Sequence, residues 1–114
     1  MAKRLSAAKL RDAAPLFAAL GDPTRLALVV LLSAGGPESI ARLSEKVDVS
    51  RQAVTKHLNV LADAGLARSF REGRESIWEL EPNRLDTARS YLDRIGAQWD
   101  EALERLREFV EDEE

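Results

Sequence analysis

The sequence predicts a mainly α-helical domain with one β-hairpin and about five helices. Three observations carry this prediction. Apolar residues recur at helical spacing through most of the chain. Capping residues open these segments, and glycine closes several of them. Residues 66–80 instead resemble two short strands around a glycine turn. Because 114 residues fit one domain, we expect that domain over residues 10–110, after a flexible segment at 1–9 and before an acidic tail at 111–114.

The first expected helix covers about residues 10–20. Its apolar side includes Leu16, Phe17 and Leu20. Pro15 is awkward inside a helix because it lacks a backbone N–H, so the helix either begins near residue 13 or is kinked there. Gly21 then ends the helix.

A second helix and a short third one are expected next. Asp22 and Pro23 suit the N-cap and the first helical position, and the helix that they open runs to about residue 33. It is apolar on several sides, which favours a central place in the core. After the break at residues 35–37, a short helix covers about residues 39–46.

The fourth expected helix follows a tight turn at residues 47–49. Ser50 caps it, and Gly65 stops it after about residue 64. Apolar residues at spacings of four and three form its buried stripe. These residues are Val54, Leu58 and Leu61.

The hairpin at residues 66–80 turns at Glu72 and Gly73. Phe70 is expected to face inward on its first strand. Ile77 and Trp78 are adjacent, so they must point to opposite faces of the second strand.

A long last helix is expected over about residues 83–110. Its apolar positions recur every three or four residues, close to the seam of a coiled coil. About 28 residues span roughly 42 Å, more than a domain of this size needs to cover its own core. We therefore predict a homodimer formed by the first and last helices. The predicted contact residues are Leu16, Phe17, Leu92, Ile95, Trp99, Leu103 and Leu106.

Two short helices joined by a tight turn and followed by a hairpin indicate a winged helix-turn-helix, whose second helix enters the major groove of DNA. The recognition helix is then residues 50–64 and the wing residues 67–80. Polar side chains that can pair with base edges or phosphates lie on the exposed side of this helix and on the wing. The predicted double-stranded DNA contacts are Ser50, Arg51, Gln52, Thr55, Lys56, Asn59, Arg68, Arg71 and Arg74.

His57, the only histidine, has two interpretations. Its angle around the helix places it beside Val54 and Leu61 rather than on the outer face. That position is typical of a structural hydrogen bond, whereas a contact to phosphate or a base is the alternative.

Three stretches resemble the ArsR family of bacterial regulators. They are Phe17-Ala-Ala-Leu-Gly-Asp-Pro-Thr-Arg-Leu, then Ser50-Arg-Gln-Ala-Val-Thr-Lys-His-Leu-Asn-Val-Leu-Ala-Asp-Ala-Gly-Leu, and Arg71-Glu-Gly-Arg. The resemblance implies a winged-helix homodimer that binds an inverted-repeat operator and usually represses transcription. It also implies a DNA contact by His57. The family's metal sensors often carry cysteines on the helix before the recognition helix, where this chain has Ile40-Ala-Arg-Leu-Ser, so the sequence resembles the metal-independent members.

Composition limits the other function classes. The chain has no cysteine, so it has neither disulfides nor a thiolate site, and we expect no metal and no cofactor. The longest purely apolar run has seven residues, against about 20 for a membrane span, which favours a cytoplasmic protein. Residues 100–114 hold eight acidic and two basic side chains, whereas residues 1–99 hold fifteen basic and twelve acidic ones. The excess of acidic side chains is thus confined to residues 100–114.

Two alternatives remain beside the DNA-binding regulator. Winged helices also bind proteins, and the acidic tail would suit such a module, which predicts no salt-steep DNA affinity. An enzyme is disfavoured because no cysteine nucleophile, glycine-rich phosphate loop or histidine with a triad partner is present. The effector is not indicated by any motif.

Overall fold

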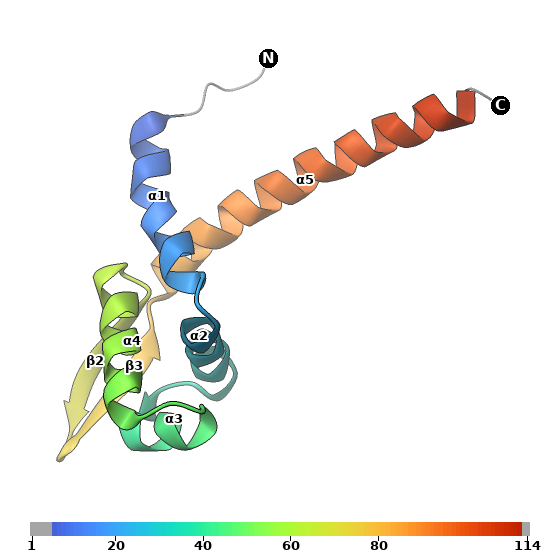
Figure 1. The fold of residues 1–114 in the computed structure, drawn as a ribbon. Coiled ribbons are helices and arrows are strands. Elements are labelled where there is room, and N and C mark those ends of the chain that lie inside the picture. Colours follow the sequence, from blue (N-terminus) through green and yellow to red (C-terminus); the bar gives the residue numbers. More distant parts are fainter. Residues whose placement is uncertain (1–5, 113–114) are drawn as a thin grey trace.

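The computed structural model describes residues 6–112 (Figure 1). The elements in chain order are α1 (Ala7–Leu20), α2 (Pro23–Gly35), β1 (Glu38–Ser39), α3 (Ile40–Lys46), α4 (Arg51–Asp63), β2 (Ala67–Glu72), β3 (Glu75–Leu80) and α5 (Pro82–Asp112). This confirms the predicted fold class of five helices and one hairpin. The radius of gyration is 18.8 Å, whereas a compact domain of this length has about 13 Å. The excess comes from α5, which projects far beyond the rest of the chain (Figure 1).

Side-chain caps fix where the helices begin. Ser6, Asp22, Ser39 and Ser50 each accept a backbone N–H from the first turn of the helix that follows. The Ser6 cap starts α1 at Ala7, so the expected flexible segment at 1–9 is wrong for residues 7–9. Its residues 1–5 lie outside the described residues, as do residues 113–114 of the expected acidic tail.

The α1 helix runs through Pro15 without interruption. The hydrophobic core forms where the helices α1 to α4 pack against the sheet. The buried stripe predicted for α4 is confirmed, because Val54, Leu58 and Leu61 have no exposed surface. The largest fully buried side chains are Leu16, Leu28, Leu43, Val54, Leu58, Leu61 and Leu66.

The hairpin is part of a three-stranded antiparallel sheet in the order β1-β3-β2. The two-residue β1 was not predicted; it pairs Ser39 with Ile77 and makes β3 the central strand. Ile77 and Trp78 are both buried, on opposite faces. The prediction that Phe70 faces inward is wrong, because this side chain is 42% exposed. Beyond Ala67 the strand β2 extends past the core, so Phe70 is covered only in part.

The turn between α4 and β2 depends on Gly65, whose φ of +79° lies in the left-handed region. A Cβ atom here would come within 3.2 Å of the Arg84 side chain. Arg84 in turn donates to the Asp12 carboxylate at 3.0 Å and to its carbonyl oxygen at 3.2 Å. Gly65 thus allows the start of α5 to join both α1 and the end of α4.

We expect Gly65→Ala to lower the free energy of unfolding by more than Gly73→Ala does. Both glycines have positive φ, which costs an alanine about 1–2 kcal/mol, but a Cβ at Gly73 would meet no atom within 4 Å. Urea unfolding of the two variants measures the difference. Equal losses would show that the Arg84 side chain moves aside freely.

Candidate nucleic-acid interface

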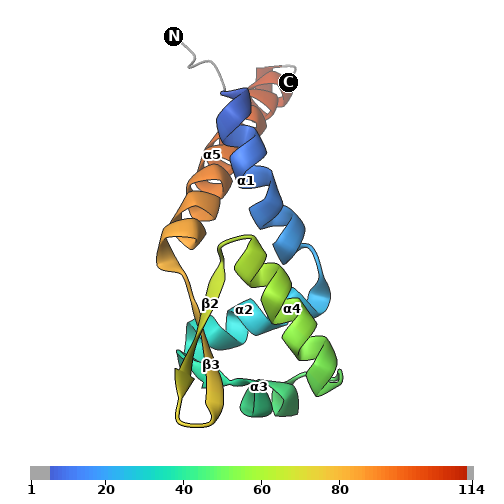
Figure 2. The ribbon, with the colours of Figure 1, turned by 90° about the vertical axis from the view of Figure 1, so that its left-hand side faces the viewer.

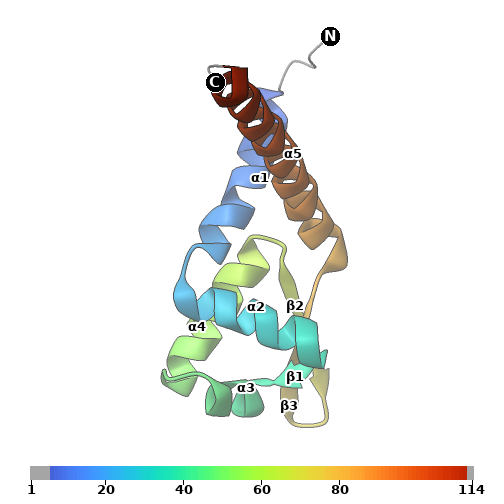
Figure 3. The ribbon, with the colours of Figure 1, turned by 90° about the vertical axis from the view of Figure 1, so that its right-hand side faces the viewer.

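The helix-turn-helix and the tip of the hairpin gather at one end of the domain. Figures 1 and 2 show α3, the start of α4 and the β2–β3 turn together at this end, while α5 leaves from the opposite end. Figure 2 faces α4 and the hairpin, whereas Figure 3 faces α2 and the free length of α5. The candidate DNA surface and the projecting helix are therefore well separated.

The outer face of α4 is polar and open. Arg51, Gln52, Lys56 and Asn59 are exposed, as the buried stripe on the other side of the helix requires. Thr55 is only partly exposed, and its hydroxyl donates to the carbonyl oxygen of Arg51 at 3.1 Å. Four of the predicted residues thus lie together in a position to meet a groove, with Thr55 at the margin.

Ser50 caps α4 and is also predicted to contact DNA. Its Oγ accepts the backbone N–H of Ala53 at 3.1 Å, which fixes the start of α4. A hydroxyl that accepts this bond keeps its own proton for a further acceptor. The Ser50 side chain is exposed, so a phosphate oxygen could be that acceptor.

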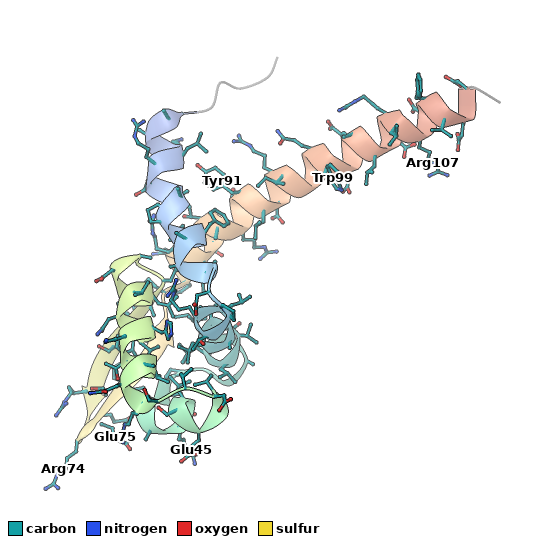
Figure 4. The ribbon with its side chains drawn as sticks, in the orientation of Figure 1. Glu45, Arg74, Glu75, Tyr91, Trp99 and Arg107 are labelled. Carbon is teal, nitrogen blue, oxygen red and sulfur yellow. The ribbon has the colours of Figure 1, made fainter. Side chains whose placement is uncertain are left out.

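The three arginines of the wing differ in their surroundings. Arg71 and Arg74 are exposed, and no ion pair involves either of them within residues 6–112. Figure 4 shows the Arg74 side chain extending outward from the tip of the wing. Their cationic groups are free to approach a phosphate backbone.

Arg68 lies at the base of the wing and is held by two carboxylates. Its guanidinium donates to Glu79 at 2.8 Å and to Glu81 at 2.9 Å. The hydrogen bond to Glu79, and next the charge of Glu81, raise the pKa of Arg68. Because this cation already has counter-charges, Arg68 is less available to a phosphate than Arg71 and Arg74, and its DNA contact stays a prediction.

His57 turns one ring nitrogen toward the start of α2. Its Nδ1 lies 3.3 Å from Nη1 of Arg25 and 3.8 Å from a carboxylate oxygen of Asp22. The side chain is 23% exposed. The structural interpretation of His57 therefore has named partners, Arg25 and Asp22, that no local sequence pattern indicated.

Asp22 caps α2 through the backbone N–H groups of Thr24 and Arg25, at 2.9 and 3.1 Å. The hydrogen bond from the backbone N–H of Arg25 lowers the pKa of the carboxyl group most; partial burial opposes this, while the hydrogen bond from Thr24 adds to the lowering. The ionised carboxylate is thus the form that the folded chain favours.

This depressed pKa predicts an acid-dependent loss of stability. A carboxyl group whose pKa is lowered by folding stabilises the folded state above its ordinary value of 3.8, and the contribution disappears as pH falls through the lower folded value. We expect the unfolding free energy of the wild type to exceed that of Asp22→Asn at pH 7, and the difference to shrink by about pH 3. Urea unfolding at both pH values measures it. A difference that is the same at both would contradict the account.

The free length of α5 presents a continuous apolar face. Leu92, Ile95, Trp99, Leu103 and Leu106 are between 47% and 64% exposed. These residues lie on the same side of the helix as Ala88, which is buried against the chain's own core. The apolar face therefore continues beyond the domain with nothing in the described chain to cover it; Figure 4 shows Trp99 on this free length.

The contribution of α1 to this surface is smaller than predicted. Leu16 has no exposed surface, because it packs in the core of the same chain, so we remove it from the predicted dimer contacts. Phe17 is partly buried, and its ring meets Tyr91 of α5 edge-on with centroids 6.5 Å apart. It thereby ties α1 to α5.

Comparison with known proteins agrees with this architecture. Residues 20–69 match a family described as a helix-turn-helix domain. The chain is 37% identical over 95 residues to an HTH-type transcriptional regulator of Mycobacterium tuberculosis, covering 83% of this chain and 85% of that protein. It is 34% identical to an ArsR-like transcriptional regulator from Rhodococcus, with a TM-score of 0.74 over 95% of this chain and 98% of that one. The chain belongs to the ArsR family.

A further ArsR-family neighbour concerns assembly. The chain is 25% identical to a possible ArsR-family regulator of Mycobacterium bovis, with a TM-score of 0.65 over 86% of this chain and 91% of that one. That structure is described as a homodimeric winged helix-turn-helix DNA-binding domain. Like these relatives, this ArsR-family chain is a transcriptional regulator with a helix-turn-helix DNA-binding domain.

Residues 6–112 contain no group of three or more histidine, cysteine or acidic side chains placed to hold a metal ion. No single helix among them is long and apolar enough to cross a membrane; only α1 and α2 taken together, bent by 94°, pass that test of length and composition.

Proposed function

We propose that this chain is a homodimeric repressor that binds an inverted-repeat operator through α4 and the wing. The observation that carries the proposal is the presence of two exposed surfaces of different chemistry at opposite ends of one domain. One is a polar, cationic face on α4 and the wing tip, and the other is an apolar face on α5. The first suits DNA, and the second suits another copy of the chain.

The side chains of α4 have the chemistry that base recognition needs. Gln52 and Asn59 can each form two hydrogen bonds with adenine, and Arg51 and Lys56 can pair with guanine or with phosphates. All four are exposed. Arg71 and Arg74 on the wing add contacts to the backbone or the minor groove. The proposal therefore divides sequence recognition and backbone binding between α4 and the wing.

A second copy of α5 would complete the apolar face. Leaving a tryptophan and four aliphatic side chains about half exposed is unfavourable, and an antiparallel partner helix would cover them. Two recognition helices set about 34 Å apart would then meet successive major grooves. The homodimeric relative from Mycobacterium bovis supports this assembly.

The charge distribution is compatible with the proposal. The six acidic residues at positions 100–112 follow α5 away from α4, while residues 1–99 carry a net positive charge. The formal charge of −3 for the whole chain therefore does not oppose DNA binding at the other end.

Fluorescence anisotropy with the promoter region upstream of the chain's own gene tests the proposal. We expect binding to be tighter than to random duplex and to weaken steeply as salt rises from about 50 to 200 mM. Equal, weak binding to both duplexes would contradict the proposal and would favour a protein-interaction module.

A further inference from the structure

Arg25 stands at a junction of three helices. Its Nε donates to the carbonyl oxygen of Ala19, in the last turn of α1, at 2.6 Å. Its Nη1 lies 3.3 Å from Nδ1 of His57, in the middle of α4. Arg25 itself belongs to the first turn of α2, where its backbone N–H bonds to Asp22. One guanidinium therefore joins the ends of α1 and α2 to the recognition helix.

The chemistry of this contact fixes the state of the histidine ring. A guanidinium can only donate hydrogen bonds, so Nδ1 of His57 must be the acceptor. The nearest carboxylate oxygen, on Asp22, is 3.8 Å from Nδ1, which is too far for a hydrogen bond. The ring that fits this geometry is neutral and carries its proton on Nε2.

The contact adds something that the apolar core cannot supply. Val54, Leu58 and Leu61 bury one side of α4 completely, but apolar contacts are not directional and allow a helix to turn slightly about its axis. A hydrogen bond has a required direction. The bond from Arg25 to His57 therefore restrains the rotation of α4, and so the direction in which its outer face points.

We propose that His57 is a positioning residue that aligns α4 for DNA and couples it, through Arg25, to the helix α1. The coupling reaches the dimer surface because Phe17 of the same α1 helix packs against Tyr91 of α5. This inference rests on the proposed function. It differs from a direct contact between His57 and DNA, which the family resemblance implies.

Two substitutions of His57 distinguish the role of Nδ1 from the role of Nε2. In His57→Asn the amide oxygen can take the place of Nδ1 and accept from Arg25, whereas in His57→Gln the amide lies farther out, near the place of Nε2. We expect His57→Gln to lose about tenfold in operator affinity, equivalent to about 1.4 kcal/mol. His57→Asn should stay within about threefold of wild type.

The comparison with random DNA distinguishes positioning from contact. A positioning residue leaves random-duplex affinity and the salt dependence unchanged, because no phosphate contact is lost. A direct phosphate contact would weaken both duplexes and reduce the salt slope by about one. That result, or His57→Gln binding the operator as well as wild type, would overturn the proposal. Sedimentation and thermal unfolding of each variant confirm that dimer and fold persist.

A measurement without DNA separates this inference from the proposed function. The ¹⁵N chemical shifts of the imidazole report which nitrogen carries the proton, and we expect the Nε2–H form at neutral pH. An Nδ1–H ring would overturn the proposal whatever the DNA results. Failure of the proposed function would appear differently, as unsubstituted protein that binds no operator.

Discussion

The Trp99→Glu variant is expected to be monomeric and to lose at least about 100-fold in operator affinity. Trp99 is 64% exposed in the single chain and lies near the middle of the apolar face of α5. In an antiparallel pair each copy would place a carboxylate against apolar surface near the symmetry axis, which costs several kcal/mol when the charge has no partner. Losing the link between the half-sites removes an avidity of about 10² to 10⁴.

Sedimentation velocity and anisotropy with the same samples measure both effects of Trp99→Glu. Gln98→Glu is the matched control, because it adds the same charge one residue away, about 100° around the helix and off the apolar face. The control should remain dimeric and bind DNA like wild type. A Trp99→Glu protein that is still a dimer, or a monomer with full operator affinity, would contradict the proposed assembly.

The Arg51→Ala, Lys56→Ala double variant is expected to lose about 100-fold in operator affinity while remaining folded and dimeric. Both side chains are exposed on α4. A base contact of this kind contributes about 1–3 kcal/mol, and each lost phosphate contact lowers the salt slope by about one. Because neither residue packs in the core, thermal unfolding should change little.

The control for this double variant removes the same two charges from the other end of the molecule. Arg94 and Arg105 are exposed on α5 and lie off its apolar face. Replacing both by alanine should leave operator affinity within about twofold, since screening is nearly complete beyond about 10 Å at 0.1 M salt. Equal losses in both double variants would mean that net charge alone, and not the face of α4, determines binding.

Local sequence signals were sufficient for most of the fold. Ser50 and Gly65 mark the ends of α4 because a side-chain cap and a left-handed turn are each specified by one residue. The alternation in residues 66–80 located the hairpin, but alternation says only which side a residue faces. Whether other atoms cover that side depends on distant packing, and for this reason Phe70 was misplaced.

The sequence predicted those residues of the candidate site whose membership depends only on their being exposed. The outer face of α4 follows from the helical period and its apolar stripe. The ion pairs of Arg68 had an available signal, because a hairpin that turns at Gly73 places Arg68 directly across from Glu79. The bond between Arg25 and His57 had none, since 32 residues separate the partners. Its existence depends on how α2 and α4 pack.

Selection of binding sites from randomised DNA duplexes tests the central claim most directly, because it needs no knowledge of the regulated genes. The wild-type chain should enrich an inverted repeat whose half-site centres lie about one helical turn, or 10 base pairs, apart or a multiple of it. The Trp99→Glu chain should not enrich it. Enrichment of a single unrepeated half-site, or of no sequence at all, would contradict the account of a dimer that reads DNA through α4.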